Sequence, residues 1–214
     1  MVRKMRLALP NKGRLVKPCL NLLNEIGIEL LGEDRAYIRP TTSPNIEVIF
    51  ARAFDIPVYV EYGCVDLGIT GQDLVMERSA NVFNLHTLNF GTCKMVVAVP
   101  KNSPINTISD MQQTIRVSTE FPNISEKYFQ SLGKQVEVLE VRGATELAPL
   151  LGLSEVIVDI TSTGETLKKN NLKIISTIMD SSSSLIGNKL SYRLFEKEIT
   201  SILDRLGKIG GVEN

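Results

Sequence analysis

The sequence predicts an α/β protein built from two lobes, and three observations support that prediction. Short runs rich in β-branched residues are each followed by a polar turn and then by a helical pattern, and this alternation repeats several times. The 214 residues are 43% hydrophobic and 22% charged, which is an ordinary globular composition. An acidic residue, an apolar strand and a Thr-Gly turn occur at residues 63–71 and again within 153–164. One such segment in each half indicates two lobes facing a cleft, although a chance match explains so short a pattern about as well.

The N-terminal half is predicted to alternate strands with short helices. The elements expected there are a buried strand at 5–9, a polar loop at 10–14, a helix at 15–26, a strand at 45–51, a short helix opening at 55–60 and a strand at 65–69. Gly27 ends the first of these helices. Pro57 fits the first turn of the second helix, because a proline there loses no helical hydrogen bond.

The C-terminal half continues the same alternation. Strands are expected at 94–99, 114–119, 136–141, 156–160 and 172–178, and helices at 124–132, up to 150, at 167–170 and at 191–206. The serine run at 181–184 is predicted to be flexible or to form a turn. We expect the chain to cross between the lobes near 88–98 and to return near 172–180. Residues 1–90 and 178–214 are therefore assigned to the first lobe and residues 91–177 to the second.

Charge, histidine and cysteine content exclude several classes of function. Lys and Arg number 24, as do Asp and Glu, so the net charge is zero and a generally basic nucleic-acid binder is excluded. A phosphorylated ligand would then have to be held by local loops and a few placed cations. His86 is the single histidine, which leaves little scope for a histidine-based nucleophile system and favours a structural role. Cys19, Cys64 and Cys93 are too few and too widely spaced for a disulfide scaffold or a zinc site.

The sequence also predicts a soluble, cytoplasmic protein. The apolar stretch behind the basic start covers only residues 7–9, which is too short for a signal peptide. Uninterrupted apolar runs stay below the roughly 18 residues that a membrane-spanning helix requires. We therefore expect neither a membrane nor a nucleic acid as partner.

The loop that follows the predicted strand at 156–160 is the most informative feature. Thr161, Ser162, Thr163 and Thr166 supply hydroxyl groups, and Gly164 allows the backbone to turn with its amides pointing inward. Such a loop at the start of a helix can hold a phosphate without a net positive charge. The competing interpretation is a simple helix-capping turn, because Ser and Thr are preferred capping residues.

Carboxylates accompany this loop. Asp159, at the end of the same strand, could accept hydrogen bonds from sugar hydroxyls or reach Mg²⁺ through water. Glu146, in the loop 142–146, could bind a ribose hydroxyl or metal-bound water, and a capping role explains it better.

Cations stand at other predicted strand ends. Lys12 and Arg14 precede a helix, where cations oppose the helix dipole unless an anionic ligand is present, and a solvated surface is the alternative. Arg35, Arg39 and Arg52 occur around a predicted strand pair, where a functional role and a structural ion pair are about equally good explanations. Gly71 and Asp73 follow the strand at 65–69, where they could hold a nucleotide or simply cap a helix at Asp73.

The chain resembles the ATP phosphoribosyltransferase family. The segments that match family patterns in the same order are Leu7–Arg14, Asp66–Leu74, Arg116–Asn123 and Asp159–Leu167, the last preceded by Glu146–Leu153. The resemblance implies two lobes of the periplasmic-binding-protein type (type II) with the active site between them. It also implies transfer of the 5-phosphoribosyl group from phosphoribosyl pyrophosphate to N1 of ATP, with Mg²⁺ carried by the substrate, as the first step of histidine biosynthesis.

The resemblance also assigns roles to individual residues. Residues expected to bind phosphoribosyl pyrophosphate are Asp159, Thr161, Ser162, Thr163, Gly164 and Thr166. Residues expected to bind ATP are Lys12, Arg14, Arg35, Arg52, Gly71 and Asp73, and of these Lys12, Arg35 and Arg52 are expected to be catalytic. Glu165 departs from what suits a phosphate loop, so we expect its side chain to point outward.

The length of the chain bears on regulation and partners. It resembles the short form of the family, which lacks a C-terminal histidine-binding domain and works with a regulatory subunit similar to histidyl-tRNA synthetase. A homodimer within a hetero-oligomer is expected. The alternatives are a two-lobed binding or sensor module of the same fold and a catalytically inactive structural subunit.

Overall fold

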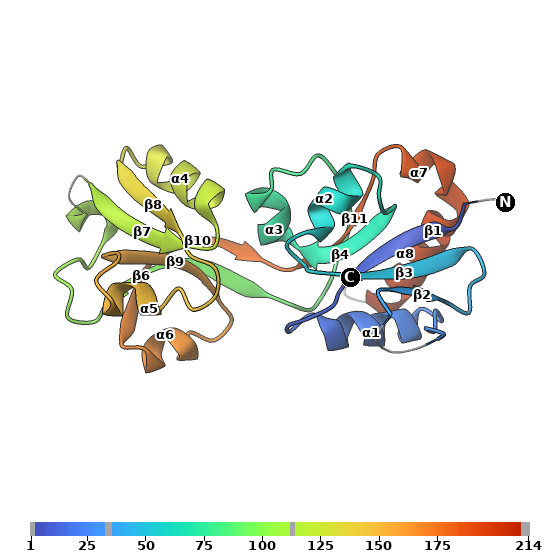
Figure 1. Cartoon of the computed structure of the whole chain (residues 1–214), viewed down its shortest axis with the longest axis horizontal. Helices are drawn as coiled ribbons and strands as arrows, with labels where there is room; N and C mark the ends of the chain where they lie inside the picture. The colour runs from blue at the N-terminus through green and yellow to red at the C-terminus, as the bar shows by residue number, and fades with distance from the viewer. Residues whose placement is uncertain (1–2, 33–35, 112–113, 211–214) are drawn as a thin grey trace. The chain divides into compact units, whose positions relative to one another are not determined.

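The computed structural model describes residues 3–32, 36–111 and 114–210 of the chain. The chain divides into two compact units: the first comprises residues 1–91 with 182–214, and the second comprises residues 92–181. Each unit has its own β-sheet flanked by helices (Figure 1). None of the helices within the described residues is long and apolar enough to cross a membrane.

The division between the units differs slightly from the boundary expected from the sequence. Residue 91 belongs to the first unit, and residues 178–181 belong to the second. The reason is that β10 (Leu172–Ser181) stays paired with β6 (Cys93–Pro100) along its whole length, down to the pair Ser181–Cys93. The predicted strand at 172–178 is therefore three residues too short.

The first unit contains a six-stranded mixed sheet in the order β2-β3-β1-β4-β11-β5. Its strands are β1 (Met5–Pro10), β2 (Ile38–Pro40), β3 (Ile46–Ala51), β4 (Leu67–Gly71), β5 (Phe83–Thr87) and β11 (Ser183–Gly187). Strands β3, β1 and β4 run parallel, and β2, β11 and β5 each run antiparallel to the strand they pair with. The carboxyl ends of the three parallel strands therefore lie at one edge.

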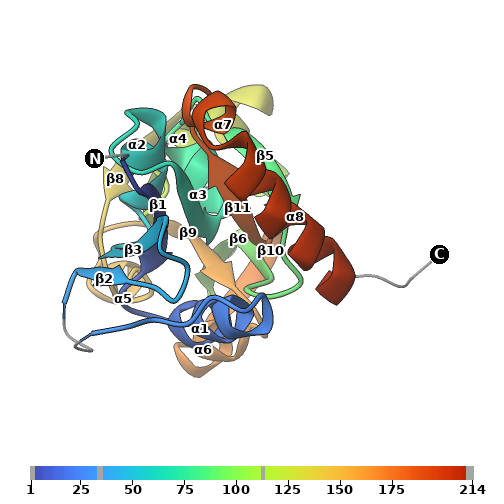
Figure 2. The same cartoon turned by 90° about the vertical axis from the view of Figure 1, so that its right-hand side faces the viewer.

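Helices cover both faces of this sheet (Figure 2). They are α1 (Val16–Glu25), α2 (Ile56–Glu61), α3 (Gln72–Glu77), α7 (Ser191–Leu194) and α8 (Glu196–Gly210). Leu7 and Leu9 of β1 belong to the core that α1 and α8 complete, whereas Ala8 packs with α2. This follows from strand geometry, because successive side chains point to opposite faces. Gly27, with a φ of +71°, terminates α1 as the sequence predicts.

Two local predictions for the first unit are wrong. The serine run 181–184 is mostly strand where a flexible segment or a turn was expected: Ser181 ends β10 of the second unit, and Ser183 and Ser184 are buried at the start of β11, which pairs with β4 and β5 on its two sides. The helix expected at 191–206 is split into α7 and α8 at Phe195. Just before α7, Oδ1 of Asn188 accepts hydrogen bonds from the amides of Leu190 and Ser191.

The second unit contains a five-stranded sheet in the order β10-β6-β9-β7-β8. Its remaining elements are β7 (Ile115–Thr119), β8 (Val136–Glu140), β9 (Val156–Thr161), α4 (Pro122–Ser131), α5 (Leu147–Leu150), α6 (Glu165–Lys169) and a 3₁₀ turn (Ile108–Asp110). Strands β8, β7 and β9 are parallel, so their carboxyl ends also share one edge. Ile157 of β9 and Leu167 of α6 belong to the same buried hydrophobic cluster, so the elements on both sides of the loop between them are anchored in the core.

Candidate functional site

The loops of interest in the second unit leave the sheet at the carboxyl ends of three neighbouring parallel strands. Strand β7 is followed by Glu120, β8 by the loop 142–146, and β9 by the loop 161–166. In open α/β sheets this edge is where ligands bind, because loops from adjacent strands converge there. The sheet order thus brings together segments that are separated by up to about forty residues in the chain.

The loop 161–166 is held by hydrogen bonds from its own amides. The amide of Gly164 donates to Oγ1 of Thr161 at 2.8 Å, and the amide of Glu165 donates to Oγ1 of Thr163 at 3.4 Å. Gly164 has a φ of +76°, which favours glycine, and nothing lies within 4 Å of where a Cβ would be. The hydroxyls of Thr161 and Thr163 accept these bonds and keep their own protons available to donate.

The side chains of Ser162 and Glu165 have contacts outside this loop. Oγ of Ser162 donates to the carbonyl of Thr92 at 3.3 Å. The side chain of Glu165 is 72% exposed and lies 3.9 Å from Nζ of Lys169. The outward orientation expected for Glu165 agrees with this exposure.

Asp159 is the most perturbed carboxylate of this edge. Burial raises the pKa of Asp159 from 3.8 to about 6, and the negative charges of Glu146 and Glu120 act in the same direction. Its Oδ1 accepts a hydrogen bond of 2.7 Å from the amide of Ile160, which favours the charged form. The charges of two further carboxylates therefore act on Asp159, and one of them, Glu120, is not among the site residues expected from the sequence.

At the first unit's corresponding edge the loops carry cations. Lys12 and Arg14 lie exposed in the loop after β1, and Arg52 lies exposed directly after β3. The amide of Asn11 donates to the carbonyl of Ala51 at 2.7 Å, so the ends of β1 and β3 are joined. The structure thus brings Lys12, Arg14 and Arg52 to one edge of the sheet.

The remaining basic residues singled out in the sequence are Arg35, Arg39 and His86. Arg35 lies outside the described residues. Arg39 is buried and donates to the carbonyls of Leu31 and Gly32 at 3.2 and 3.4 Å, so backbone carbonyls occupy its guanidinium. His86 lies half-buried in β5.

Gly71 and Asp73 form a tight turn at the end of β4. Asp73 is 4% exposed, and a Cβ on Gly71 would lie 2.1 Å from its Oδ1. Gly71 is therefore needed so that the carboxylate can fold back over the backbone. The helix begins after Gly71, which is its N-cap, rather than at Asp73 as the capping interpretation expected.

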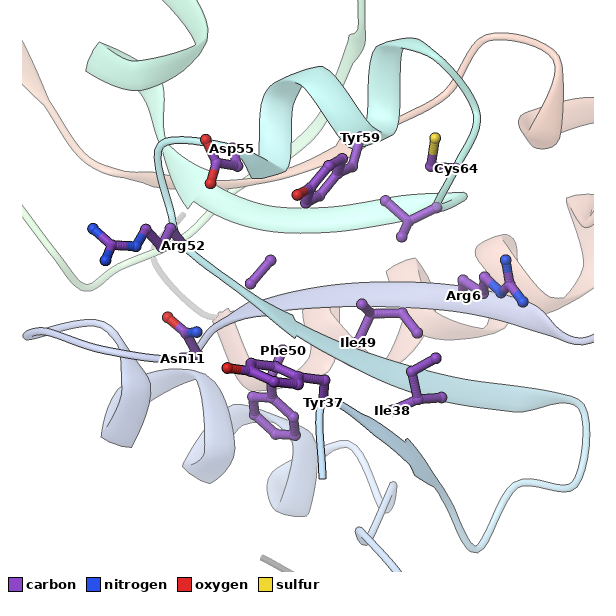
Figure 3. A pocket seen from close by; sticks show the side chains of 12 residues that line it. Arg6, Asn11, Tyr37, Ile38, Ile49, Phe50, Arg52, Asp55, Tyr59 and Cys64 are labelled. Carbon is purple, nitrogen blue, oxygen red and sulfur yellow. The ribbon is translucent and has the colours of Figure 1, made fainter. Parts of the chain in front are cut away.

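A cavity of about 480 Å³ lies in the first unit beside α2 (Figure 3). Asn11, Arg52 and Asp55 lie at one end, Arg6 and Cys64 lie at the other, and Tyr37 and Tyr59 face the space between them. No sequence pattern points to the tyrosines, because Tyr37 is brought here by strand pairing: its carbonyl accepts from the amide of Phe50 at 2.7 Å.

The fold defines a class of protein. The structure is similar to the periplasmic aliphatic sulphonate binding protein SsuA from Escherichia coli, with a TM-score of 0.61 and 12% identity over 97% of this chain and 72% of that chain. The SsuA protein from Xanthomonas axonopodis is similar with a TM-score of 0.56 and 11% identity, over 98% of this chain and 80% of that one. The chain therefore has the two-lobed fold of the periplasmic binding proteins.

Sequence similarity identifies the family. The family model for ATP phosphoribosyltransferase matches residues 52–208. The ATP phosphoribosyltransferase of Methanocaldococcus jannaschii is 46% identical over 89% of this chain and 67% of its own length, and that of Methanosarcina mazei is 45% identical over 90% and 67%. The solved ATP phosphoribosyl transferase (HisG:HisZ) complex from Thermotoga maritima contains a chain with a TM-score of 0.85 and 33% identity, over 96% of this chain and 98% of that one. The chain belongs to the ATP phosphoribosyltransferase family.

Proposed function

We propose that this chain transfers the 5-phosphoribosyl group from phosphoribosyl pyrophosphate to N1 of ATP and releases pyrophosphate, the reaction that opens histidine biosynthesis. The family match over residues 52–208 carries the proposal. The loop geometry at the two sheet edges supports it, because one edge offers hydroxyls and carboxylates and the other offers cations.

The loop 161–166 would bind the 5-phosphate. Its hydroxyls at Thr161 and Thr163 can donate to phosphate oxygens while they accept from the backbone, so a neutral loop can hold an anion. Ser162, Gly164 and Thr166 complete this loop. Asp159 would accept hydrogen bonds from the ribose hydroxyls, a role that requires its ionised form.

The first unit would supply the positive charge. Lys12, Arg14 and Arg52 would contact the triphosphate and the departing pyrophosphate, with Arg35 as a further contributor. The proposal is supported by the backbone of Arg52, whose carbonyl accepts from the amides of Asp55 at 2.9 Å and Ile56 at 3.2 Å just before α2. Gly71 would let the nucleotide approach the backbone. Because the Asp73 carboxylate is buried, its contribution would be to shape that turn.

The chemistry needs charge stabilisation more than proton transfer. N1 of adenine is already nucleophilic, so no strong general base is required, and the scarcity of histidine agrees with this. Negative charge develops on the pyrophosphate as it leaves the anomeric carbon, and preorganised cations lower the barrier by stabilising that charge. Holding both substrates in line supplies a further part of the rate enhancement.

Mg²⁺ would arrive with the substrate. Among the described residues, no group of three or more His, Cys, Asp or Glu side chains is arranged to hold a metal ion. Magnesium commonly keeps several water and phosphate ligands and takes few from the protein. The carboxylates at the second unit's edge would therefore suit a Mg²⁺ ion that is held mainly by phosphate and water, and not one that is enclosed by protein ligands.

A solved relative bears on the partners of this chain. The similar chain from Thermotoga maritima comes from a HisG:HisZ complex, and the alignment covers 98% of it. On this basis we propose that the present chain forms a cytoplasmic homodimer that assembles with a regulatory subunit similar to histidyl-tRNA synthetase.

The test is a direct assay of the purified chain. Protein, ATP, phosphoribosyl pyrophosphate and Mg²⁺ are mixed with and without a candidate regulatory subunit, and the ultraviolet absorbance of the N1-substituted adenine is followed. Product that depends on both substrates supports the proposal. Substrate binding by calorimetry without product in either mixture would instead favour a binding or sensor module.

A further inference from the structure

Glu120 is a carboxylate at the second unit's edge that none of the expected roles includes. It directly follows β7, whose last residue Thr119 pairs with the end of β8 on one side and with β9 on the other. Its Oε1 accepts a hydrogen bond from the amide of Gly143. A charged acceptor makes this hydrogen bond stronger than one between neutral groups.

The bond joins β7 to the loop that follows β8. A second bond acts nearby, because the amide of Val141 donates to the carbonyl of Thr119 at 2.9 Å. Gly143 has a φ of +112°, a conformation that glycine adopts readily and other residues avoid, and open space surrounds the position of a Cβ there. Beyond Gly143 the loop turns locally, with the amide of Thr145 donating to the Gly143 carbonyl at 3.0 Å, and reaches Glu146.

Glu146 is the part of this loop that matters to the site. The loop that carries it follows β8, which pairs with β7, and β7 in turn pairs with β9, which carries Asp159. The charges of Glu146 and Glu120 both act on Asp159. The negative charge of Glu146 repels that of Asp159, so a hydrogen bond that ties the loop 142–146 to the sheet acts against this repulsion. The bond from Gly143 to Glu120 supplies such a tie and gives the Glu120 carboxylate a donor of its own.

We propose that Glu120 is a positioning residue: by accepting the Gly143 amide it holds the loop 142–146 so that Glu146 stands beside Asp159, where the ribose of phosphoribosyl pyrophosphate binds. The inference rests on the proposed function and deepens it. Glu120 itself does not touch the reacting atoms. Its effect is therefore specific to one substrate, because ATP is assigned to the other unit.

Two substitutions separate the acceptor from the charge. Glu120→Ala removes the acceptor and raises the KM for phosphoribosyl pyrophosphate about tenfold, while the KM for ATP stays within about twofold. Glu120→Gln keeps a carbonyl oxygen in place of Oε1, so its KM for phosphoribosyl pyrophosphate stays within about threefold of the unsubstituted protein. Both remove a negative charge near Asp159, so the acid limb of the pH profile shifts to lower pH in both. Glu126→Ala, at an exposed position of α4 in the same unit, is the matched control and changes none of these quantities.

A double-mutant cycle tests the bond itself. Gly143→Ala disturbs the same bond from the donor side, because alanine resists a φ of +112°. We expect Gly143→Ala to raise the same KM, and the double variant to be no worse than the worse single variant. Effects that multiply, or a Glu120→Ala variant that changes both KM values equally, would overturn the proposal.

Hydrogen exchange separates failure of this inference from failure of the proposed function. Amide exchange over 142–146 needs no substrate, and Glu120→Ala is expected to accelerate it about tenfold while Glu120→Gln does not. An unsubstituted protein that forms no product and binds no phosphoribosyl pyrophosphate refutes the proposed function. A protein that is active, whose Glu120→Ala variant exchanges normally or keeps its KM for phosphoribosyl pyrophosphate, refutes only the role of Glu120.

Discussion

The two units place opposite chemistry at equivalent positions of their sheets. In the first unit the loops after parallel strands β1 and β3 carry the cations Lys12, Arg14 and Arg52. In the second unit the loops after parallel strands β7, β8 and β9 carry hydroxyls and the carboxylates Glu120, Glu146 and Asp159, and the pKa of Asp159 is raised. Under the proposed function, the first unit's edge would bind the polyanion and the second unit's edge would bind the sugar phosphate.

Under the proposed function, the contrast would explain how a protein with no net charge binds phosphorylated substrates. A triphosphate and a departing pyrophosphate carry several charges and need cations. A single phosphate can be held by hydroxyl and amide donors, while the ribose beside it needs acceptors. Net charge is summed over the whole chain, so a value of zero shows neither the cations at one edge nor the carboxylates at the other.

The largest effect is expected at the cationic edge. Arg52→Ala should lower kcat by about 100-fold or more, because a positive charge aimed at the leaving group is lost. The side chain is exposed, so the midpoint of chemical unfolding should barely move. Arg193→Ala, an exposed arginine of α7, is the control in steady-state assays. Normal turnover in a folded Arg52→Ala protein would remove Arg52 from the catalytic residues.

At the hydroxyl-rich edge the backbone should matter more than charge. Gly164→Ala forces alanine toward a φ of +76° and should raise the KM for phosphoribosyl pyrophosphate about tenfold, with a stability loss of about 1 kcal/mol. Gly133→Ala is a close match, since Gly133 has a φ of +68° with equally open surroundings at the end of α4. Both variants should lose similar stability in urea unfolding. If the KM rises equally in both, the loop 161–166 is not the phosphate site.

The carboxylates at the second unit's edge should make the stability of the protein depend on pH. The pKa of Asp159 is about 6 in the folded state and 3.8 ordinarily, so the folded state binds the proton more tightly. Stability therefore falls as the pH rises through the window between these two pKa values, and it stays lower at higher pH. Asp159→Asn should therefore stabilise the protein by about 2 kcal/mol above this window and by little below it. It should also lower kcat/KM for phosphoribosyl pyrophosphate. Urea unfolding at several pH values is the measurement, and a pH-independent difference would contradict the assignment.

The smallest effect compares strained backbone in the two units. Thr114 in the second unit and Ser79 in the first have φ values of +70° and +48°. Thr114→Gly should stabilise by about 0.5–1 kcal/mol, because a β-branched residue is especially disfavoured there, and Ser79→Gly should give less. Neither should alter the KM of either substrate. Calorimetric unfolding checks the ranking, and a destabilised Thr114→Gly protein would show that its side chain contributes more than its backbone costs.

Local patterns predicted most of the elements and the loops that carry the candidate site. Gly27 and Gly133 end their helices, with φ values of +71° and +68°. The loop 161–166 and the basic residues near strand ends were found from residue type alone, because parallel strands in α/β proteins place such loops at one edge. Their binding roles remain predictions.

Features that depend on distant segments were missed. The serine run 181–184 looks like a turn, and only its insertion beside β4 and β5 makes part of it a buried strand. Tyr37 and Tyr59 enter the same cavity through strand pairing and helix packing, for which a single sequence has no signal. The bond between Glu120 and Gly143 likewise depends on two strands that are neighbours in the sheet.

By itself the sequence determined the α/β class, the alternation of elements and the residue types at the strand ends, because these depend on periodicity and turn chemistry over a few residues. The tertiary structure alone decided the order and register of the strands. That order buries Asp73, ties Arg39 to backbone carbonyls, and makes neighbours of the strands β8, β7 and β9, which carry or precede Glu146, Glu120 and Asp159. The physical reason is that pKa values, charge repulsion and loop anchoring depend on distances in space, and pairing between distant segments sets those distances.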